Sequence, residues 1–293
     1  MKKIAITTGD KLGIGKELVT KALNILKPEK NRIVIIGEKI DADYDFIPVD
    51  IESNGEFCFQ SLKLVSNLAI EDKIQGIVTA PVSKKVLNDA GHNFSGQTEI
   101  LEYFLSPNEK QAQMLFIADN LKVMLLTRHL ALSEIKLKKE DIIHQTKILN
   151  NFLIDKYKIK YPKIALCALN PHAGENGILG KDEINILSPA VQELNKSNIQ
   201  ITKPISADAL FARIGREYLN NEKLSYDAIL ACYHDQGLCP LKALAFNKAV
   251  NTTIGLKVIR TSPSSGTAYD IAGKNIANPD SMVEAIKLAI KLS

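Results

Sequence analysis

Several features that would point to a membrane, to secretion or to nucleic acid are missing from this sequence. No run approaches the roughly 18 apolar residues that a membrane span requires. The apolar stretch after Met1 is too short for the core of a signal peptide. No Lys/Arg cluster is interleaved with aromatic residues, as it is in nucleic-acid binders. We therefore expect a cytoplasmic protein with no membrane or nucleic-acid partner.

Cysteine is scarce, and its spacing suggests neither a disulfide framework nor a zinc finger. The four cysteines, Cys58, Cys167, Cys232 and Cys239, form no C-x-x-C pair, and three of them lie in apolar runs. We interpret them as reduced thiols, which fits the reducing cytosol. The formal net charge of +4 is too small to suggest nucleic acid, but a mild positive charge suits an anionic small substrate.

What the sequence does contain is a repeated alternation of short β-rich runs and amphipathic helical stretches. With 293 residues the chain is long enough for two domains. Strand–helix alternation favours an α/β fold, with mostly parallel sheets covered by helices on both faces. The predicted strands are Ile4–Thr7, Arg32–Ile36, Ile77–Thr79, Val123–Thr127, Ile164–Ala168, Ala228–Ala231 and Val250–Ile254, and the predicted helices are Lys16–Leu26, Lys139–Tyr157, Asp182–Asn195 and Ser281–Leu292.

The first predicted strand runs into a glycine-rich turn, Gly9–Gly15, which matches neither of the common nucleotide-binding fingerprints. A P-loop would have glycine at Asp10 and Ser or Thr at Glu17, and a Rossmann fingerprint would have glycine at Leu18. Two interpretations stay open at this point. The segment is either a plain strand-to-helix turn or a backbone-lined wall of a ligand cleft at a helix N-terminus.

Three of the five histidines, His129, His172 and His234, directly follow predicted buried strands. Because the carboxyl ends of parallel strands meet at one edge of a sheet, we expect the three imidazoles at the same rim. Three neutral imidazoles make a site for a divalent metal with open positions for substrate. The alternative is three separate histidines, each hydrogen-bonded locally, and the residues alone leave both open.

Further polar residues follow His234 through one strand–loop run, namely Lys242, Asn251 and Arg260. Lysine and arginine together suit a phosphate or carboxylate, which arginine can bind bidentately. Ordinary surface charge is the alternative for each residue taken singly. As a set, the three indicate an anion-binding site.

At this point several long motifs carry a resemblance to a known family. They are ITTGDKLGIGKE, TAPVSKKVLNDAG with FSGQTE after it, TRHLAL, LNPHAGENGILGKDEI, SADALF, YHDQGLCPLK and AVNTTIGLKVIRTS. The NPHAGE and YHDQG segments are long and specific. Over most of its length the chain resembles the 4-hydroxythreonine-4-phosphate dehydrogenase family of the vitamin B6 pathway, most weakly over Glu38–Asn67.

The resemblance implies an isocitrate/isopropylmalate dehydrogenase-like fold, with two α/β/α domains around a cleft, in a homodimer. We expect a cofactor-side domain at residues 1–125 plus 255–293, and a metal-, substrate- and dimer-forming domain at residues 126–254. The active site is expected at the subunit interface. The substrate implied is a small phosphorylated hydroxy-amino acid.

The resemblance also implies the roles of individual residues. His129, His172 and His234 are expected to bind a divalent metal, zinc first, with magnesium or cobalt as alternatives, and one of the three is expected to come from the partner subunit. The substrate-binding candidates are Gln97, Thr98, Lys242, Asn251 and Arg260, and the catalytic candidates are Asp208, Asp235 and Lys242.

The tail SGTAYDIAGKNIANPD is similar to the adenosine-binding loop of the wider dehydrogenase superfamily. It implies cofactor contacts from Ser265, Gly266, Thr267, Asp270 and Asn275. A carboxylate at Asp270 can accept hydrogen bonds from the ribose hydroxyls of NAD, whereas it would repel the 2′-phosphate of NADP. We expect NAD, with NADP as the alternative.

The function implied is metal-dependent, NAD-linked oxidation, with decarboxylation, of 4-phosphooxy-L-threonine in pyridoxal 5′-phosphate biosynthesis. Three departures keep alternatives open: Gln97 replaces the usual histidine of the GHTE motif, Ser264–Ser265 replace the usual Asp-His, and Thr8, Lys11 and Leu12 alter the usual Pro-Gly-Glu-Pro-Ala-Gly opening. One alternative is a dehydrogenase of a related hydroxy acid, phosphothreonate or phosphoerythronate. The other is a metal-binding homologue that has lost catalysis.

Overall fold

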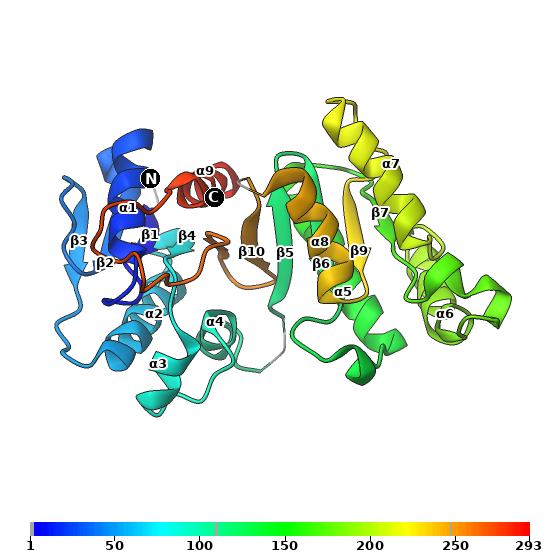
Figure 1. Cartoon of the computed structure of the whole chain (residues 1–293), viewed down its shortest axis with the longest axis horizontal. Coiled ribbons are helices and arrows are strands. Elements are labelled where there is room, and N and C mark those ends of the chain that lie inside the picture. The colour runs from blue at the N-terminus through cyan, green and yellow to red at the C-terminus, as the bar shows by residue number, and fades with distance from the viewer. Residues whose placement is uncertain (1–2, 109–110, 247) are drawn as a thin grey trace. The chain divides into compact units, whose positions relative to one another are not determined.

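The computed structural model describes residues 3–108, 111–246 and 248–293, and the chain divides into two compact units (Figure 1). Unit 1 comprises Met1–Ala112 and Val250–Ser293, and unit 2 comprises Gln113–Ala249. Unit 2 is thus one continuous segment inserted into unit 1. Both boundaries precede those expected from the sequence, because the first hairpin of unit 2 begins at Gln113.

Unit 1 contains a mostly parallel sheet. Its strands are β1 (Lys3–Thr7), β2 (Ile33–Gly37), β3 (Asp45–Pro48), β4 (Ile74–Thr79), β10 (Val250–Ile254) and β11 (Ile259–Ser262), in the order β3-β2-β1-β4-β11-β10. Among the strand pairs described in this unit, β10–β11 is antiparallel and the others are parallel. β1 and β2 are runs of Ile, Val, Ala and Thr because both faces of the sheet are covered.

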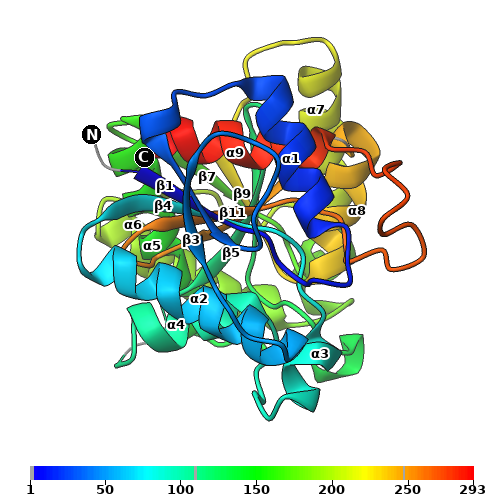
Figure 2. The same cartoon turned by 90° about the vertical axis from the view of Figure 1, so that its left-hand side faces the viewer.

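Helices lie on both faces of the unit 1 sheet (Figures 1 and 2). One face carries α1 (Gly15–Leu26) and α9 (Asp280–Leu292), and the other carries α2 (Asn54–Ile70), α3 (Lys84–Asp89) and α4 (Gln97–Leu105). A 3₁₀ turn, η1 (Lys30–Arg32), precedes β2. Phe57 and Leu62 of α2 are fully buried against the strands, so this face holds a continuous apolar core.

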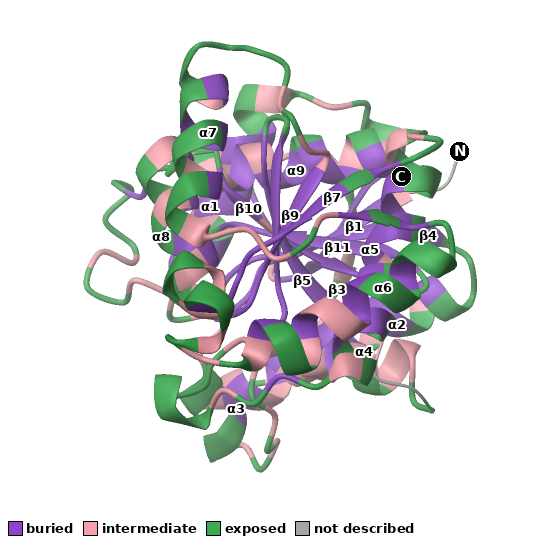
Figure 3. Cartoon of the chain, turned by 90° about the vertical axis from the view of Figure 1, so that its right-hand side faces the viewer, coloured by how far each residue is buried: buried purple, intermediate pink, exposed green. Residues whose placement is uncertain are grey.

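Unit 2 is a second α/β layer structure. Its strands are β5 (Gln113–Ala118), β6 (Leu121–Leu125), β7 (Lys163–Leu166), β8 (Gln200–Ile201) and β9 (Ala228–Ala231), in the order β5-β6-β9-β7-β8, and only the β5–β6 hairpin is antiparallel. α5 (Lys139–Tyr157) and α6 (Ser188–Lys196) cover one face, and α7 (Ala207–Leu219) and α8 (His234–Ala245) cover the other. The strands are buried and the outer helix faces exposed (Figure 3).

Short helical turns complete unit 2, namely η2 (Leu132–Glu134), η3 (Pro171–Gly177) and a π-helical turn, η4 (Glu183–Leu187). The expected α/β fold class is confirmed. None of the helices in the described residues combines the length and the hydropathy needed to span a bilayer. Of the predicted polar residues, His129 and His172 lie in segments that follow strands, Asn251 and Arg260 lie within β10 and β11, and Gln97, Thr98, Asp208, His234, Asp235 and Lys242 lie in helices.

Candidate active site

Unit 1 buries a guanidinium group that has no counter-charge among the described residues. Arg260 on β11 is only 4% exposed, and its Nε and Nη2 atoms both donate to Thr79 Oγ1, at 2.8 and 2.6 Å. Among the described residues no carboxylate lies within ion-pair distance of it. Burial lowers the pKa of Arg260 to about 10, against the opposing field of Glu99. Such a charge is costly unless something pairs with it, so this position is suited to an anion.

Other predicted substrate residues gather at the carboxyl end of β4. Gln97, the first residue of α4, donates from Nε2 to the carbonyl of Ala80 at 3.1 Å, next to the Thr79 hydroxyl that Arg260 contacts. Thr98 follows it and is 5% exposed. Two of the five predicted residues, Gln97 and Arg260, are therefore bonded to consecutive residues of one strand end.

Buried oxygens without a hydrogen-bond partner occur around the same strands. They include Gln97 Oε1, Asn251 Oδ1 on β10 and Thr7 Oγ1, at the end of β1 and opposite Thr79. Asn251 pairs with Ser262, two residues beyond Arg260 on β11. Because buried polar groups are nearly always hydrogen-bonded, unpaired ones beside an unpaired guanidinium indicate space for a polar ligand.

The Gly9–Gly15 turn is held by a buried carboxylate, Asp10, which is 1% exposed. Asp10 Oδ1 accepts from the backbone of Leu12 at 3.0 Å and from Asn54 Nδ2 at 2.7 Å, while Oδ2 accepts from the hydroxyl of Tyr269 at 2.5 Å. Gly9 has φ +74°, and a Cβ there would lie 2.5 Å from the Pro81 carbonyl. The turn therefore requires glycine for both conformation and space.

The tail that carries the predicted cofactor residues lies directly on this turn. The carbonyl of Thr267 accepts from the backbone of Ile14 at 3.0 Å. At the far end, Lys21 of α1 donates to the carbonyls of Asn275 and Ala277 at 2.9 and 3.0 Å. Ser265 and Gly266, just before the first anchor, and Asp270, between the two anchors, are exposed. The glycine turn and the start of α1 thus support the predicted adenosine loop.

Glu17, one helical turn before Lys21, reinforces that second anchor. Its Oε1 accepts from Lys21 Nζ and from the backbone of Ala277, both at 2.8 Å. Burial raises the pKa of Glu17, but these hydrogen bonds and the lysine charge outweigh it and leave the pKa lowered. The carboxylate stays ionised near neutral pH and keeps the loop end in place.

In unit 2 two of the three predicted metal ligands come together. His129 lies four residues beyond β6. His234 is the first residue of α8, the helix that follows β9. Their ring centroids are 5.3 Å apart with the planes inclined at 43°. His234 Nδ1 is hydrogen-bonded to Asp235 Oδ1 at 2.6 Å, a contact that fixes the orientation of a ligand ring.

His172 is held apart from that pair, in η3. Residues His172, Ala173, Gly174, Glu175 and Asn176 all have positive φ, between 41° and 75°. For a residue with a Cβ this left-handed conformation costs about 1–2 kcal/mol, so the surrounding structure must stabilise the turn. Backbone strain of this kind is concentrated at functional sites.

Within one chain the described residues include no group of three or more His, Cys, Asp or Glu side chains that could hold a metal ion. His129 and His234 therefore meet, and His172 does not join them. Asp208, in the first turn of α7, lies within the electrostatic reach of His172. A hydrogen bond from Ser206, then one from the Ala209 backbone, and to a smaller degree the His172 charge, lower the pKa of Asp208.

The remaining catalytic candidates are accessible. Asp208 and Asp235 are both exposed, each at the start of a helix and each beside a histidine. Lys242 is exposed near the end of α8. It lies eight residues beyond His234, which corresponds to about 12 Å along the helix.

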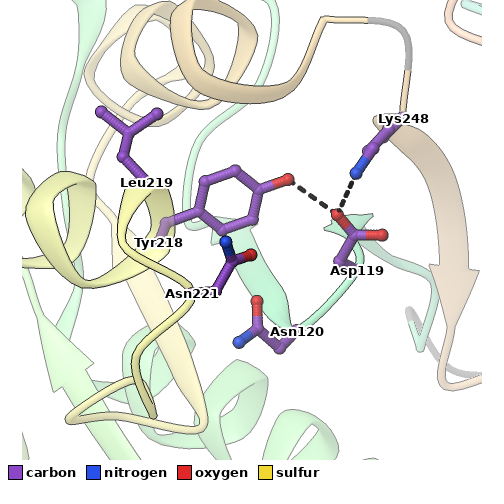
Figure 4. Close-up of a pocket in the computed structure, with 6 residues that line it drawn as sticks. All are labelled: Asp119, Asn120, Tyr218, Leu219, Asn221 and Lys248. Carbon is purple, nitrogen blue, oxygen red and sulfur yellow. Dashed lines mark hydrogen bonds and ion pairs between the residues drawn. The ribbon is translucent and has the colours of Figure 1, made fainter.

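A pocket of about 500 Å³ opens elsewhere in unit 2 and contains none of the predicted residues (Figure 4). It is lined by Asp119, Asn120, Tyr218, Leu219, Asn221 and Lys248. Asp119 Oδ2 already accepts from the Tyr218 hydroxyl at 2.8 Å and from Lys248 Nζ at 2.9 Å. The pocket lies beyond the C-terminal end of α8, whereas His234 begins that helix.

Sequence reasoning missed the residues that support the site, namely Thr79, Asp10, Asn54, Tyr269 and Glu183. Asp10 carried a usable signal, because a carboxylate directly after a strand and a glycine often caps the turn that follows. Its partner Tyr269 is 259 positions away in the sequence, and no local pattern links the two.

Comparison with known proteins decides the family. The model of the pyridoxal phosphate biosynthetic protein PdxA family matches residues 16–289. The chain belongs to this family. It is 38% identical to a 4-hydroxythreonine-4-phosphate dehydrogenase of Sulfurihydrogenibium sp., over all of this chain and 98% of the relative. It is also 35% identical to a "Putative D-threonate 4-phosphate dehydrogenase" of Oceanobacillus iheyensis, over 99% of this chain and 97% of the relative.

Solved structures agree with this assignment to the PdxA family. The crystal structure of 4-hydroxythreonine-4-phosphate dehydrogenase from Klebsiella pneumoniae superposes with a TM-score of 0.86, at 30% identity, over 100% of this chain and 99% of that one. Isocitrate dehydrogenase from Methylococcus capsulatus, at 14% identity and a TM-score of 0.58, shares the fold. The expected family and fold relationship are confirmed, and the chain is an oxidoreductase of the nicotinamide-dependent dehydrogenase type.

Proposed function

We propose that the protein oxidises a small phosphorylated hydroxy acid, with 4-phosphooxy-L-threonine as the first candidate, in pyridoxal 5′-phosphate biosynthesis. The observation that carries the proposal is the buried guanidinium of Arg260, which lacks a carboxylate partner among the described residues. A phosphate supplies two negative charges and several acceptor oxygens, and arginine binds it bidentately. Thr98, Asn251 and Lys242 are the further substrate-binding residues we propose.

The metal would be held by His129 and His234 of one chain together with His172 of the partner subunit. The spacing and tilt of the first two rings suit two ligands of one ion. The hydrogen bond between His234 Nδ1 and Asp235 Oδ1 fixes the orientation of one ring, as hydrogen-bond partners of metal-binding histidines commonly do. Imidazole ligands suit zinc first, with cobalt as an alternative and magnesium less favoured by nitrogen. When bound, a divalent ion lowers the pKa of a coordinated hydroxyl and stabilises charge on oxygen.

The homodimer is proposed from apolar side chains that remain exposed around the histidine loops. They are Leu130 and Leu132 beyond His129, Ile178 and Leu179 beyond His172, and Ile184 of η4, with exposed fractions of 45% to 80%. Large apolar side chains that remain exposed are candidates for burial in an interface between subunits. A second copy docked on these side chains would bury them and bring its own His172 toward the His129–His234 pair.

The chain's own residues have distinct roles in the proposed reaction, an oxidation followed by loss of carbon dioxide. Arg260 holds the phosphate, and Asp235 orients His234. Asp208 is the proton-transfer candidate because of its position near His172. The nicotinamide supplies the hydride-acceptor chemistry, and the loop from Ser265 to Asn275 holds the adenosine half of the cofactor.

A second substrate is favoured by a specific observation. One relative carries the name of a D-threonate 4-phosphate dehydrogenase, and that compound has a hydroxyl where 4-phosphooxy-L-threonine has an amine. In this chain Gln97 is half-buried, and its buried Oε1 is unpaired near the strand end. An amide can donate to or accept from either group but carries no proton near neutral pH. Phosphothreonate and phosphoerythronate therefore belong in every substrate test.

The decisive experiment follows nicotinamide reduction at its absorbance maximum against a panel of phosphorylated hydroxy acids, with and without added zinc, cobalt or magnesium. We expect turnover of 4-phosphooxy-L-threonine or of a phosphothreonate, and loss of turnover after chelation. Turnover of unphosphorylated analogues at the same rate would contradict the role of Arg260. Absence of turnover for the whole panel, with cofactor and metal bound, would indicate a homologue that has lost catalysis.

We propose NAD as the preferred cofactor, and Asp270 is the residue that tests it. Asp270 is exposed on the loop that the glycine turn supports, where its carboxylate can accept from ribose hydroxyls and repel a 2′-phosphate. Asp270→Ser is expected to weaken NAD binding and to strengthen NADP binding, as measured by titration calorimetry. Asp155→Ser, which removes the same charge from an exposed position on α5, should change neither affinity.

A substitution at Ser265 can be tested by the same titration calorimetry with NAD and NADP. Ser265→His is expected to tighten NAD binding, because an imidazole can stack on adenine and base–aromatic stacking is worth about 1–3 kcal/mol. Tighter binding of NADP than of NAD by the unaltered protein would contradict the role given to Asp270. Unchanged NAD affinity in Ser265→His would contradict stacking at that position.

We place the protein in the cytoplasm on the state of its cysteines. Cys58, Cys167 and Cys232 are buried free thiols, and Cys239 is an exposed one. Burial raises the pKa of Cys58 and of Cys167 to about 12, so these two are unreactive thiols rather than disulfide precursors. A reducing compartment suits a chain with an exposed free thiol.

A further inference from the structure

The loop that carries His172 is built around a buried carboxylate outside the predicted site. Glu183, the first residue of η4, is 5% exposed. Its Oε1 accepts from the backbone N–H of Asn170 at 2.8 Å, and its Oε2 accepts from Asn170 Nδ2 at 3.0 Å. Among the described residues no lysine, arginine or histidine pairs with it. The two hydrogen bonds from Asn170 are therefore what stabilises this buried charge.

The left-handed turn packs closely against the side chains of Asn170 and Glu183. Gly174, at its centre, is buried, and a Cβ at that position would lie 2.6 Å from Glu183 Oε2. Gly180 has φ +143°, and a Cβ there would lie 2.4 Å from Asn170 Nδ2. Asp182 Oδ2 also accepts from Asn170 Nδ2, at 3.0 Å. The two ends and the middle of the loop thus converge on one pair of side chains.

His172 itself takes no part in these contacts and is exposed at the edge of the turn. It has φ +51° and is followed by Ala173 at +53°, conformations that residues with a Cβ rarely adopt without support. Within the turn, Leu179 N donates to Gly174 O at 3.1 Å and Ile178 N donates to Glu175 O at 3.2 Å. These two hydrogen bonds close its C-terminal end, and Glu183 packs against its middle at Gly174.

We propose that Glu183 is a positioning residue for His172. By accepting both hydrogen bonds from Asn170 and packing against Gly174, its carboxylate keeps the left-handed turn formed before any ligand binds. His172 then has a fixed orientation before the subunits associate. The loop that carries it does not have to become ordered when His172 reaches the metal site of the partner subunit. The inference rests on the proposed role of His172 as a metal ligand. Glu183 would not touch the metal and would affect metal binding only by fixing the backbone conformation around His172.

The test is Glu183→Gln, with Co²⁺ as the probe. The glutamine can still accept from the Asn170 backbone, but its amide NH₂ faces the NH₂ of Asn170, so two donors oppose each other. We expect Co²⁺ affinity, measured by competition with a chromogenic chelator, to fall about 10- to 100-fold. The visible absorption spectrum of the Co²⁺ protein should also change, because the third imidazole is misplaced.

Glu175→Gln is the matched control, since Glu175 is an exposed carboxylate of the same turn and its loss removes the same charge. It should leave the Co²⁺ affinity and spectrum unchanged. A second variant, Gly174→Ala, places a methyl group against Glu183 Oε2 and should reproduce the loss if Glu183→Gln does not fold. Circular dichroism and the thermal midpoint establish that each variant is folded.

The outcomes separate this inference from the proposed function. Unchanged Co²⁺ affinity in folded Glu183→Gln or Gly174→Ala, together with loss in His172→Ala, would overturn the role of Glu183 alone. Unchanged affinity in His172→Ala as well would overturn the metal site itself. An equal loss in Glu175→Gln would show that only charge matters, which also overturns positioning through the turn.

Discussion

Replacing Arg260 by methionine should abolish most activity while leaving the fold at least as stable. The side chain is buried and lacks a carboxylate partner among the described residues, so its charge is available to a phosphate. Removing one member of a buried, hydrogen-bonded charge pair costs about 2–5 kcal/mol. That corresponds to a fall in kcat/KM of about thirty- to several-thousand-fold, measured by steady-state kinetics on the preferred substrate.

The stability part of this prediction has a definite sign. Burial lowers the pKa of Arg260 to about 10, which means that the empty fold disfavours the charged form. The pKa of this guanidinium is lower in the folded state than in the unfolded chain. At neutral pH, below both pKa values, its charge therefore destabilises the folded state. Methionine has a similar length and no charge, and the thermal midpoint of Arg260→Met should be equal or higher.

Arg213→Met serves as the control, since Arg213 is exposed on α7. It should change neither activity nor the KM of the phosphorylated substrate. Retention of wild-type kcat/KM in Arg260→Met would contradict phosphate binding by Arg260. A large loss of stability would contradict the reading of this guanidinium as an unpaired charge.

Mixing two inactive variants should restore activity if the metal site is built across the dimer. His172→Ala subunits retain the His129–His234 pair, and His234→Ala subunits retain His172. After subunit exchange, each heterodimer contains one site with all three ligands and one site with His129 alone. Since half of randomly formed dimers are heterodimers, we expect about one quarter of wild-type activity from a closed two-fold dimer.

The structure supplies a control pair for this experiment. His129 and His234 meet within one chain, with ring centroids 5.3 Å apart, so a mixture of His129→Ala and His234→Ala subunits should stay inactive. Recovery in that mixture, and not in the His172 mixture, would assign the partner's ligand differently. Recovery in neither, after exchange verified by mass spectrometry, would contradict a shared site.

The sequence predicted the regular elements well wherever periodicity was strong. α5 has the bounds expected from its long amphipathic pattern, Lys139–Tyr157, and β9 and β10 were also placed at their observed bounds. β5 was missed because only a two-residue turn separates it from β6, whereas the expected pattern alternated strands with helices. A hairpin places two strands in succession without a helix between them, which the expected alternation of strands and helices does not include.

The candidate site was predictable in part and for a physical reason. The rule that ligands bind at the carboxyl ends of parallel strands predicted one rim for His129 and His234, and these two rings do meet. The left-handed conformation of His172 and Ala173 was not predictable, because local propensity reserves positive φ for Gly, Asn and Asp. It depends on Glu183, which becomes a neighbour only in the folded chain.

The insertion of unit 2 into unit 1 determines the order in which the protein can be completed during synthesis. Residues 113–249 leave the ribosome as one continuous stretch that contains every strand of unit 2, so this unit can fold while the chain is still growing. Unit 1 cannot, because β11, which pairs with β4, and β10 beside it lie in the last stretch of the chain. A nascent chain that ends before Arg260 would contain the three histidines but lack the guanidinium proposed to bind the phosphate.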